Sequence, residues 1–239
     1  MLNTILFDLD GTLLPLDLNI FIKKYLEALA AKAVPFGYQP EQIIEAVWKG
    51  TYAMVDNDGT QTNIDRFWPV FWQKLGKQDS ALRAAVDDFY CNEFYTLNEN
   101  FQLQEDRSQI IHQLKNKGYT IVLATSPIFP QTALAARLSW IGLTTEDFDY
   151  LTHYENCRYC KPNLNYYRDI MQAIGKEPTE CLMVGNNIKE DCVAAELGCD
   201  TYLVTDWPEN KEGLAYKHLK HGSWQEFCLW AEALKNISL

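Results

Sequence analysis

The 239-residue sequence lacks several features that mark common classes of protein. No apolar run is long enough to cross a bilayer, and no basic stretch followed by a long apolar core opens the chain, so we expect neither a membrane protein nor a signal peptide. Basic residues are scarce: 21 Lys and Arg face 32 Asp and Glu, and the formal net charge of −11 disfavours nucleic-acid binding. A small anionic substrate is still compatible with this charge, because a local metal or lysine can reverse the field in one pocket.

The seven cysteines are odd in number and scattered along the chain. Without an export signal, this pattern favours free thiols in a reducing compartment, and we expect a cytoplasmic protein. Cys157-x-x-Cys160, with His153 nearby, suggests a zinc site or a redox pair. A structural zinc site generally needs four ligands, and no second Cys-x-x-Cys is present. We therefore interpret the two cysteines as ordinary loop thiols.

The pattern of apolar runs predicts an α/β fold. Short continuous apolar runs bounded by turns are typical of buried strands, and after about residue 105 they alternate with helical patterns. This alternation favours a parallel sheet covered on both faces. The expected strands are 5–9, 119–124, 148–151, 181–184 and 201–204, and the expected helices are 105–117, 130–140, 163–171, one that ends at Leu197, and a terminal one over 224–234.

Residues 16–102 interrupt this alternation with helical spacing alone. One helix follows Leu18, Pro40 suits the first turn of a second, and a fourth covers 82–89. Thr62 is expected to cap a third helix, which Pro69 should bend or end early. We predict an all-helical domain over 16–102, inserted into a core that consists of residues 1–15 and 103–239.

Two features of the predicted helical domain bear on substrate binding. An aromatic cluster is interpreted as domain core rather than as a platform for substrate; it consists of Phe67, Trp68, Phe71 and Trp72. Lys49 and Arg66 are candidates for contacts with substrate charge.

Two aspartates at the end of the first strand are the strongest candidates for chemistry. The run Ile5-Leu6-Phe7-Asp8-Leu9-Asp10-Gly11-Thr12 leads both carboxylates to a turn, and residues two apart on a strand project the same way. One carboxylate can attack phosphorus to form an acyl phosphate, which water then hydrolyses. The other can protonate the leaving alcohol and later deprotonate the water. A divalent cation would keep the nucleophile ionised and neutralise the charge of the substrate.

Three further residues could bind a phosphoryl group. Thr125 ends the strand 119–124, and its hydroxyl, together with the backbone N–H of Ser126, could hold a phosphoryl oxygen. Lys161 lies in a loop and could offset negative charge in the transition state. Taken alone, Thr125 is also consistent with an ordinary threonine at a strand end, and Lys161 with a solvated loop lysine. A fourth segment, 184–191, contains a strand end, a glycine turn and polar residues that could open a helix.

In this order, the four segments resemble the four motifs of the haloacid dehalogenase (HAD) superfamily, and the chain resembles its phosphoglycolate-phosphatase-like members with a helical type-one cap. The resemblance covers about residues 1–15 and 105–205. It implies a Rossmann-like, three-layer parallel-sheet core with an inserted all-helical cap, and Mg²⁺-dependent phosphoryl transfer. The implied roles are nucleophile for Asp8, general acid and base for Asp10, and phosphate binding for Thr125, Ser126 and Lys161.

The resemblance also implies a magnesium site, from which the sequence departs in one place. Asp8 and the main-chain carbonyl of Asp10 are expected ligands, and Asp191 matches the second acidic residue of the fourth motif. The first acidic residue of that motif is replaced by Asn186 or Asn187, depending on the register. An amide oxygen can bind Mg²⁺ without a formal charge, so we expect Mg²⁺ to bind with lowered affinity, for which Glu190 could compensate.

The second aspartate, Asp10, favours phosphate-ester hydrolysis, because the dehalogenases and the phosphonate-cleaving members of the superfamily lack it. We predict a phosphatase that acts on a small phosphorylated metabolite through an aspartyl phosphate. A phosphosugar mutase and a catalytically weakened binding protein, suggested by Asn186 and Asn187, are the alternatives. The sequence identifies neither the substrate nor the oligomeric state, for which a monomer is the favoured expectation.

Overall fold

A parallel β-sheet forms the centre of the computed structural model, which describes residues 1–100 and 107–237. In that part of the chain the sheet has six strands in the order β3-β2-β1-β4-β5-β6, and each neighbouring pair is parallel. The first strand therefore lies near the middle of the sheet, where both of its edges are hydrogen-bonded. The strands are β1 (Thr4–Phe7), β2 (Thr120–Leu123), β3 (Tyr150–Leu151), β4 (Cys181–Gly185), β5 (Asp200–Val204) and β6 (His221–Gly222).

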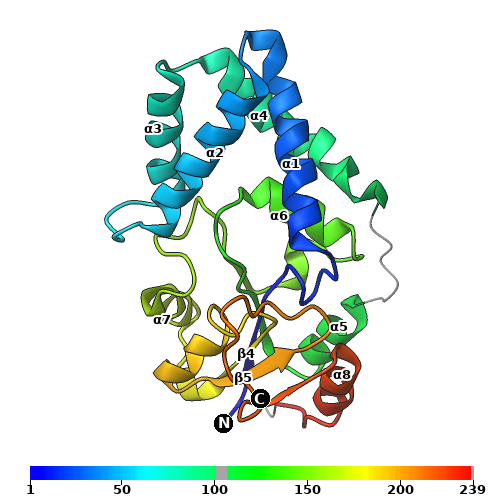
Figure 1. The fold of residues 1–239 in the computed structure, drawn as a ribbon. Coiled ribbons are helices and arrows are strands. Elements are labelled where there is room, and N and C mark those ends of the chain that lie inside the picture. Colours follow the sequence, from blue (N-terminus) through cyan, green and yellow to red (C-terminus); the bar gives the residue numbers. More distant parts are fainter. Residues whose placement is uncertain (101–106, 238–239) are drawn as a thin grey trace.

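Helices cover both faces of this sheet, as the apolar strands require (Figure 1). Side chains alternate between the faces: Ile5 and Phe7 of β1 pack in one apolar cluster with α5 and α8, and Leu6 packs in another with α7 and η5. The result is the predicted three-layer, Rossmann-like core. Its helical elements are α5 (Ser108–Asn116), α6 (Gln131–Ser139), η3 (Thr145–Asp147), α7 (Leu164–Ile174), η4 (Pro178–Glu180), η5 (Cys192–Leu197) and α8 (Trp224–Glu232).

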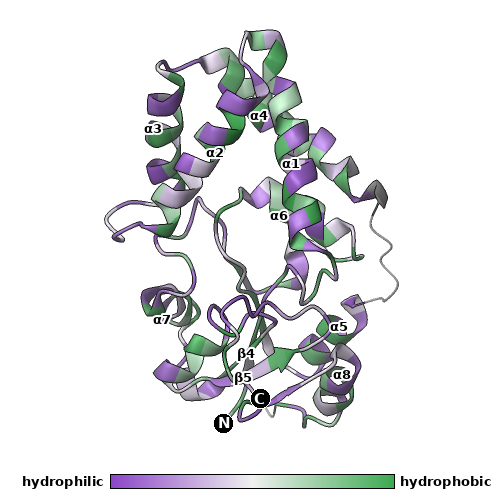
Figure 2. Ribbon diagram, in the orientation of Figure 1, coloured by the Kyte–Doolittle hydropathy of each residue, from purple (hydrophilic) through white to green (hydrophobic). Residues whose placement is uncertain are grey.

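A helical insertion follows β1 and lies beyond the carboxyl ends of the strands (Figure 1). Its helices are amphipathic: in Figure 2, hydrophobic and hydrophilic residues alternate around α1 to α4. Aromatic contacts such as Phe21 on Trp140, with ring centroids 6.0 Å apart, join it to α6. It comprises α1 (Leu18–Ala33), η1 (Val34–Phe36), α2 (Pro40–Val55), α3 (Asn63–Leu75), α4 (Ser80–Cys91) and η2 (Glu93–Asn100). The expected domain boundary at 102/103 falls outside the described residues.

Three local expectations need correction. The helix capped by Thr62 does not end early at Pro69 but continues to Leu75. Pro69 is exposed, so water can satisfy the carbonyl that its missing N–H leaves free, and buried Trp68 and Phe71 hold the helix in place. The segment before Gly198 is a 3₁₀ helix rather than a longer helix.

The third correction concerns the sheet, which has a sixth strand that the apolar pattern does not predict. This strand, β6, is only two residues long, and His221 in it is exposed. Among residues 1–100 and 107–237, no helix combines the length and the apolar character that crossing a bilayer requires.

Candidate functional site

The register of the sheet places three of the predicted motifs at one edge. Phe7 of β1 lies level with Leu123 of β2 on one side and with Val184 of β4 on the other. The residues that follow these three strands therefore leave the sheet together, below the helical insertion (Figure 1). The carboxyl edge of a parallel sheet at such a position is where α/β proteins bind ligands.

Lys161 joins two carboxylates at this edge. Its Nζ donates to Oδ1 of Asp8 at 2.8 Å and to Oδ1 of Asp191 at 2.6 Å. The Lys161 side chain is only 1% exposed, and those of Asp8 and Asp191 are 12% and 2% exposed. The second oxygen of Asp191, Oδ2, accepts the backbone N–H of Asn187 at 2.9 Å. The structure thus brings together the first, third and fourth predicted motifs around one buried ammonium group.

Burial dominates the electrostatics of this cluster. It raises the pKa of Asp8 to about 8, an effect that Lys161 only partly offsets and that the charge of Asp191 reinforces. Burial alone would lower the pKa of Lys161, but Asp191 and Asp8 together raise it well above its usual value. Burial likewise raises the pKa of neighbouring Glu190 to about 7. One lysine therefore supplies too little positive charge to keep Asp8 fully ionised at neutral pH.

Asp10 is paired with a residue that the sequence analysis did not identify. Nη1 of Arg137, on α6, donates to Oδ2 of Asp10 at 2.6 Å. The Arg137 side chain is 1% exposed, and its guanidinium lies over the ring of Phe129 at 4.5 Å. Oδ1 of Asp10 and both Nε and Nη2 of Arg137 are buried without a hydrogen-bond partner. A single arginine within the otherwise uncharged run of residues 133–141 is the signal that could have indicated this pair.

Thr125 lies where the sequence predicts, directly after β2. It is buried, and its carbonyl oxygen accepts the hydroxyls of Thr152 at 2.7 Å and Tyr166 at 2.8 Å. These bonds fix the loop from Thr125 to Phe129 beside the sheet edge. Ser126 is partly exposed, and its carbonyl accepts the N–H of Ile128 at 2.9 Å.

The two asparagines of the fourth motif have different surroundings. Oδ1 of Asn187 accepts the N–H groups of Lys189 and Glu190, both at 3.0 Å, so this side chain closes the turn after β4. Asn186 instead points toward the first motif: its Oδ1 accepts the Thr12 hydroxyl at 3.4 Å, and its Nδ2 donates to the carbonyl of Trp207 at 2.5 Å.

Gly11 is required at this contact with Asn186. Its φ is +79°, and a Cβ there would lie 2.1 Å from Nδ2 of Asn186. Asn186, rather than Asn187, therefore faces the first motif.

Comparisons with known proteins agree with this arrangement. A family model described as haloacid dehalogenase-like hydrolase matches residues 2–198. The chain belongs to this family. The pyrophosphatase PpaX of Bacillus cereus (strain AH820) is 24% identical over 204 residues, which cover 85% of this chain and 83% of the relative.

Solved structures show the same fold. A HAD phosphatase from Thermococcus onnurineus matches with a TM-score of 0.58 at 16% identity, over 99% of this chain and 100% of that one. The putative HAD-hydrolase YfnB of Bacillus subtilis, solved with bound magnesium, matches with a TM-score of 0.56 at 18% identity, over 96% and 98% of the two chains. The predicted resemblance and fold class, including the helical cap, are confirmed, and the chain is a hydrolase of the HAD-like family. The helical insertion is called the cap from here on.

The oxygen atoms near Lys161 are of the type that a HAD-like hydrolase would use to hold Mg²⁺. Carboxylate oxygens of Asp8 and Asp191, the carbonyl of Asp10 and the amide oxygen of Asn186 are all hard donors, which suit this cation. The raised pKa of Asp8 also indicates that the cluster is short of positive charge. Within residues 1–100 and 107–237, no three His, Cys, Asp or Glu side chains form a group that could hold a metal ion.

The Cys157-x-x-Cys160 segment is packed against the cap. Both thiols are buried, and burial raises their pKa values, that of Cys157 to about 12. Cys160 accepts Nδ2 of Asn63 at 3.4 Å, and Nδ1 of His153 bonds with Glu155 at 2.6 Å. The thiols are therefore protonated core groups, which agrees with their interpretation as ordinary loop thiols.

An apolar cavity of about 40 Å³ lies between the cap and the core of this HAD-like hydrolase. All four long cap helices line it, and the loops after β2 and β3 close it on the core side. Its lining residues are Ile22, Tyr25, Leu26, Leu29, Val47, Trp48, Thr51, Phe67, Trp68, Phe71, Val86, Tyr90, Ile128, Phe129 and Tyr154. Three of the four predicted cluster aromatics are thus both cap core and cavity wall. Lys49 is exposed, and neither it nor Arg66 lines this cavity.

Proposed function

We propose that the protein is a Mg²⁺-dependent phosphatase that hydrolyses a small-molecule phosphomonoester through an aspartyl phosphate on Asp8. The observation that carries this proposal is the pairing of Asp8 with Lys161, 2.8 Å apart, at the carboxyl edge of the sheet, with Asp191 on the same ammonium group. Family membership and the name of the pyrophosphatase relative support a phosphoryl substrate.

In the first step, an oxygen of Asp8 attacks phosphorus and the ester oxygen leaves on the opposite side. Lys161 orients the carboxylate and offsets the negative charge of the phosphoryl oxygens. Thr125 and the backbone N–H of Ser126 bind those oxygens. For Asp10 to act as general acid, it must be protonated when the ester binds; the proton then sits on Oδ1, because Oδ2 is held by Arg137, and passes to the leaving alcohol.

In the second step, Asp10 takes a proton from the attacking water, and the acyl phosphate breaks to regenerate Asp8 and release phosphate. When bound, Mg²⁺ would keep Asp8 ionised and neutralise charge on the phosphoryl group. Asp8, Asp191, Asn186 and the main-chain carbonyl of Asp10 are the residues that we propose to hold it. Asn187 remains in the turn, and buried Glu190 is a further carboxylate nearby.

We further propose that the cap helices, α1 to α4, act as a lid that closes over the site and excludes water. Free thiols favour a cytoplasmic location, and Cys157, Cys160 and Cys192 are free thiols in the structure. The proposed partner is a single phosphorylated metabolite.

A phosphate-release screen over many phosphorylated metabolites, with Mg²⁺ present, tests this function. We expect release from at least one phosphomonoester, and none from the Asp8→Asn variant or in the presence of a chelator. Interconversion of sugar phosphates with little phosphate release would indicate a mutase instead. Ligand binding without turnover would indicate a binding protein, the alternative that the amide at position 186 favours.

A further inference from the structure

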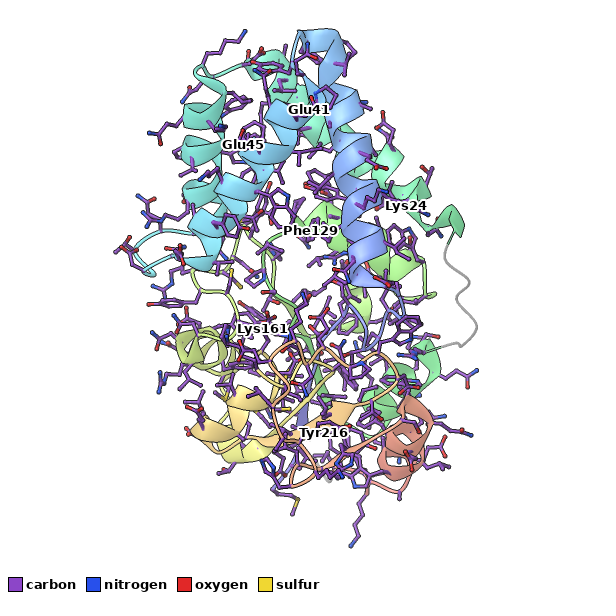
Figure 3. All side chains as sticks on the ribbon, viewed as in Figure 1. Lys24, Glu41, Glu45, Phe129, Lys161 and Tyr216 are labelled. Carbon is purple, nitrogen blue, oxygen red and sulfur yellow. The ribbon has the colours of Figure 1, made fainter. Side chains whose placement is uncertain are left out.

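The chemistry proposed at Asp8 fixes the direction in which the leaving group departs. In a phosphoryl transfer, the attacking and leaving oxygens are roughly in line through phosphorus. Asp8 follows directly after β1 and attacks from the sheet edge, so the leaving oxygen points away from the sheet and toward the cap. Figure 3 places Phe129 between the cap helices and Lys161, on this side of the site.

The apolar cavity lies in this direction and is built partly from the phosphate-binding segments themselves. Ile128 and Phe129 in its wall belong to the loop that begins at Thr125. Tyr154, another wall residue, packs in one apolar cluster with Cys160, the residue before Lys161. The cavity wall is therefore continuous along the chain with the segments proposed to bind phosphate. Another cavity, of about 220 Å³, is lined by Asp10 and Asn186 themselves, but Asp17, Asp206 and Glu209 also line it, so it is acidic rather than apolar.

No charged side chain lines this cavity within the part of the chain that the structure describes. Its polar groups are almost all occupied: the hydroxyls of Tyr25 and Tyr90 bond to each other at 2.7 Å, and Thr51 donates to the carbonyl of Val47 at 2.9 Å. Arg137 and Arg83, whose guanidinium groups lie over the wall residues Phe129 and Trp68, are paired with Asp10 and Asp87, respectively. An anionic leaving group in this cavity would therefore have no cationic side chain in the wall with which to form an ion pair.

Trp68 provides a buried donor in the wall. Its side chain is buried, and its indole N–H has no hydrogen-bond partner. Burial raises the pKa of Tyr154, and the nearby indole N–H of Trp68 partly offsets this rise. The two groups nevertheless make no hydrogen bond of normal geometry. A buried N–H without an acceptor can bind a neutral oxygen on a ligand, which is recognition of a dipole and not of a charge.

We propose that this cavity receives the leaving group, and that the preferred substrates are phosphomonoesters of small, uncharged, largely apolar alcohols. This inference rests on the proposed phosphatase function. The cavity volume of about 40 Å³ suits a group of a few carbon atoms, since one water needs roughly 10–15 Å³. The same lining disfavours esters such as phosphoglycolate, whose leaving group carries a carboxylate.

An isosteric pair of substrates tests the inference. Isobutyl phosphate and 2-phosphoglycolate both release a primary alcohol. Isobutyl phosphate carries an isopropyl group where 2-phosphoglycolate carries a carboxylate of similar size. We expect kcat/KM for isobutyl phosphate to be higher by at least about 100-fold. Burial of a valine-sized group should raise kcat/KM about tenfold, and burial of an unpaired carboxylate should lower kcat/KM about tenfold or more. Acetyl phosphate, which has a small leaving group, serves as the reference for turnover itself.

Substitutions in α2 place a charge in the cavity wall and beside it. Thr51→Lys adds a cation to the wall and should raise kcat/KM for phosphoglycolate relative to isobutyl phosphate by about tenfold or more. Thr51→Met adds similar bulk without charge and should leave phosphoglycolate a poor substrate. Tyr52→Lys is the matched control, because Tyr52 is the next residue, is 58% exposed and does not line the cavity.

The outcomes separate this inference from the proposed function. Equal kcat/KM values for the isosteric pair, or a preference for phosphoglycolate or pyrophosphate, would overturn the apolar leaving-group site and leave the phosphatase intact. An identical effect of Thr51→Lys and Tyr52→Lys would also overturn it. Absence of phosphate release from all the esters and from acetyl phosphate would overturn the function and the inference with it. If Thr51→Lys does not fold, the kcat/KM values of the unmodified protein for the isosteric pair still test the inference.

Discussion

The buried pair between Asp10 and Arg137 makes a specific prediction about stability. Asp10→Asn keeps the shape of the side chain but removes the anion 2.6 Å from Nη1 of Arg137. The guanidinium, 1% exposed, would then be a buried cation whose Nε and Nη2 already lack partners. Removing one partner of a buried ion pair typically costs about 3–5 kcal/mol. Because the Asp10 side chain is 16% exposed and partly screened, we expect a loss near the lower limit, about 3 kcal/mol.

Removing the arginine should cost less. Arg137→Met keeps an apolar chain against Phe129 and leaves Asp10, which water can reach, so we expect a loss of about 1–2 kcal/mol. The double variant leaves neither an unpaired cation nor an unpaired anion. It should therefore be more stable than Asp10→Asn alone, with a coupling of about 2 kcal/mol or more.

Thermal and urea unfolding of the four proteins measures this coupling. For a 239-residue chain, about 3 kcal/mol corresponds to a fall in Tm of roughly 6–12 °C. The matched control is Asp169→Asn, which breaks the Arg158–Asp169 pair on the surface, where the side chains are 49% and 33% exposed; its cost should stay below about 1 kcal/mol. Additive losses in the double variant, or a loss for Asp10→Asn no larger than the control, would refute the reasoning.

Three further predictions concern the candidate site. Asp8→Asn should abolish phosphate release while circular dichroism shows a folded protein; a fully active variant would remove Asp8 from its role as nucleophile. Asp10→Asn should slow alkyl phosphates more than aryl phosphates, because poor leaving groups depend most on proton donation; a uniform effect in steady-state kinetics would argue against acid catalysis. The folded-state pKa of Asp8, about 8, exceeds its ordinary value of 3.8. Between pH 3.8 and about 8, the folded protein therefore holds a proton on Asp8 that the unfolded chain has lost. Without metal, stability should therefore fall as the pH rises from 5 to 8, and urea titrations of Asp8→Asn in a chelator should show a weaker fall.

The short-range features of this protein follow from the sequence alone. Apolar runs bounded by turns located β1 to β5, although the ends of each strand shifted by up to two residues, and helical spacing located α1 to α4. The resemblance to the HAD superfamily indicated that Asp8, Thr125, Lys161 and Asp191 share one site, and a parallel sheet brings the carboxyl ends of its strands to one edge. The register of β1 with β2 and β4 has this effect.

What the sequence could not determine depended on packing between distant segments. Proline at position 69 predicted a bend or an early end of the helix, but the helix continues to Leu75, because burial of Trp68 and Phe71 outweighs the lost hydrogen bond. Strand β6 consists of His221 and Gly222, which form no apolar run, so the pattern did not indicate it. The choice between Asn186 and Asn187 was open, because it depends on which side chain reaches Thr12 and which closes a turn.

The partner of Asp10 and the shape of the apolar cavity are likewise products of the tertiary structure. Arg137 is 127 residues away from Asp10, and no local pattern links them. The cavity combines four cap helices with two loops of the core. The sequence by itself determined the elements and the types of reactive group, because these depend on neighbouring residues. Only the tertiary structure decided which charges meet and what surface the leaving group encounters, because long-range burial and contact set both.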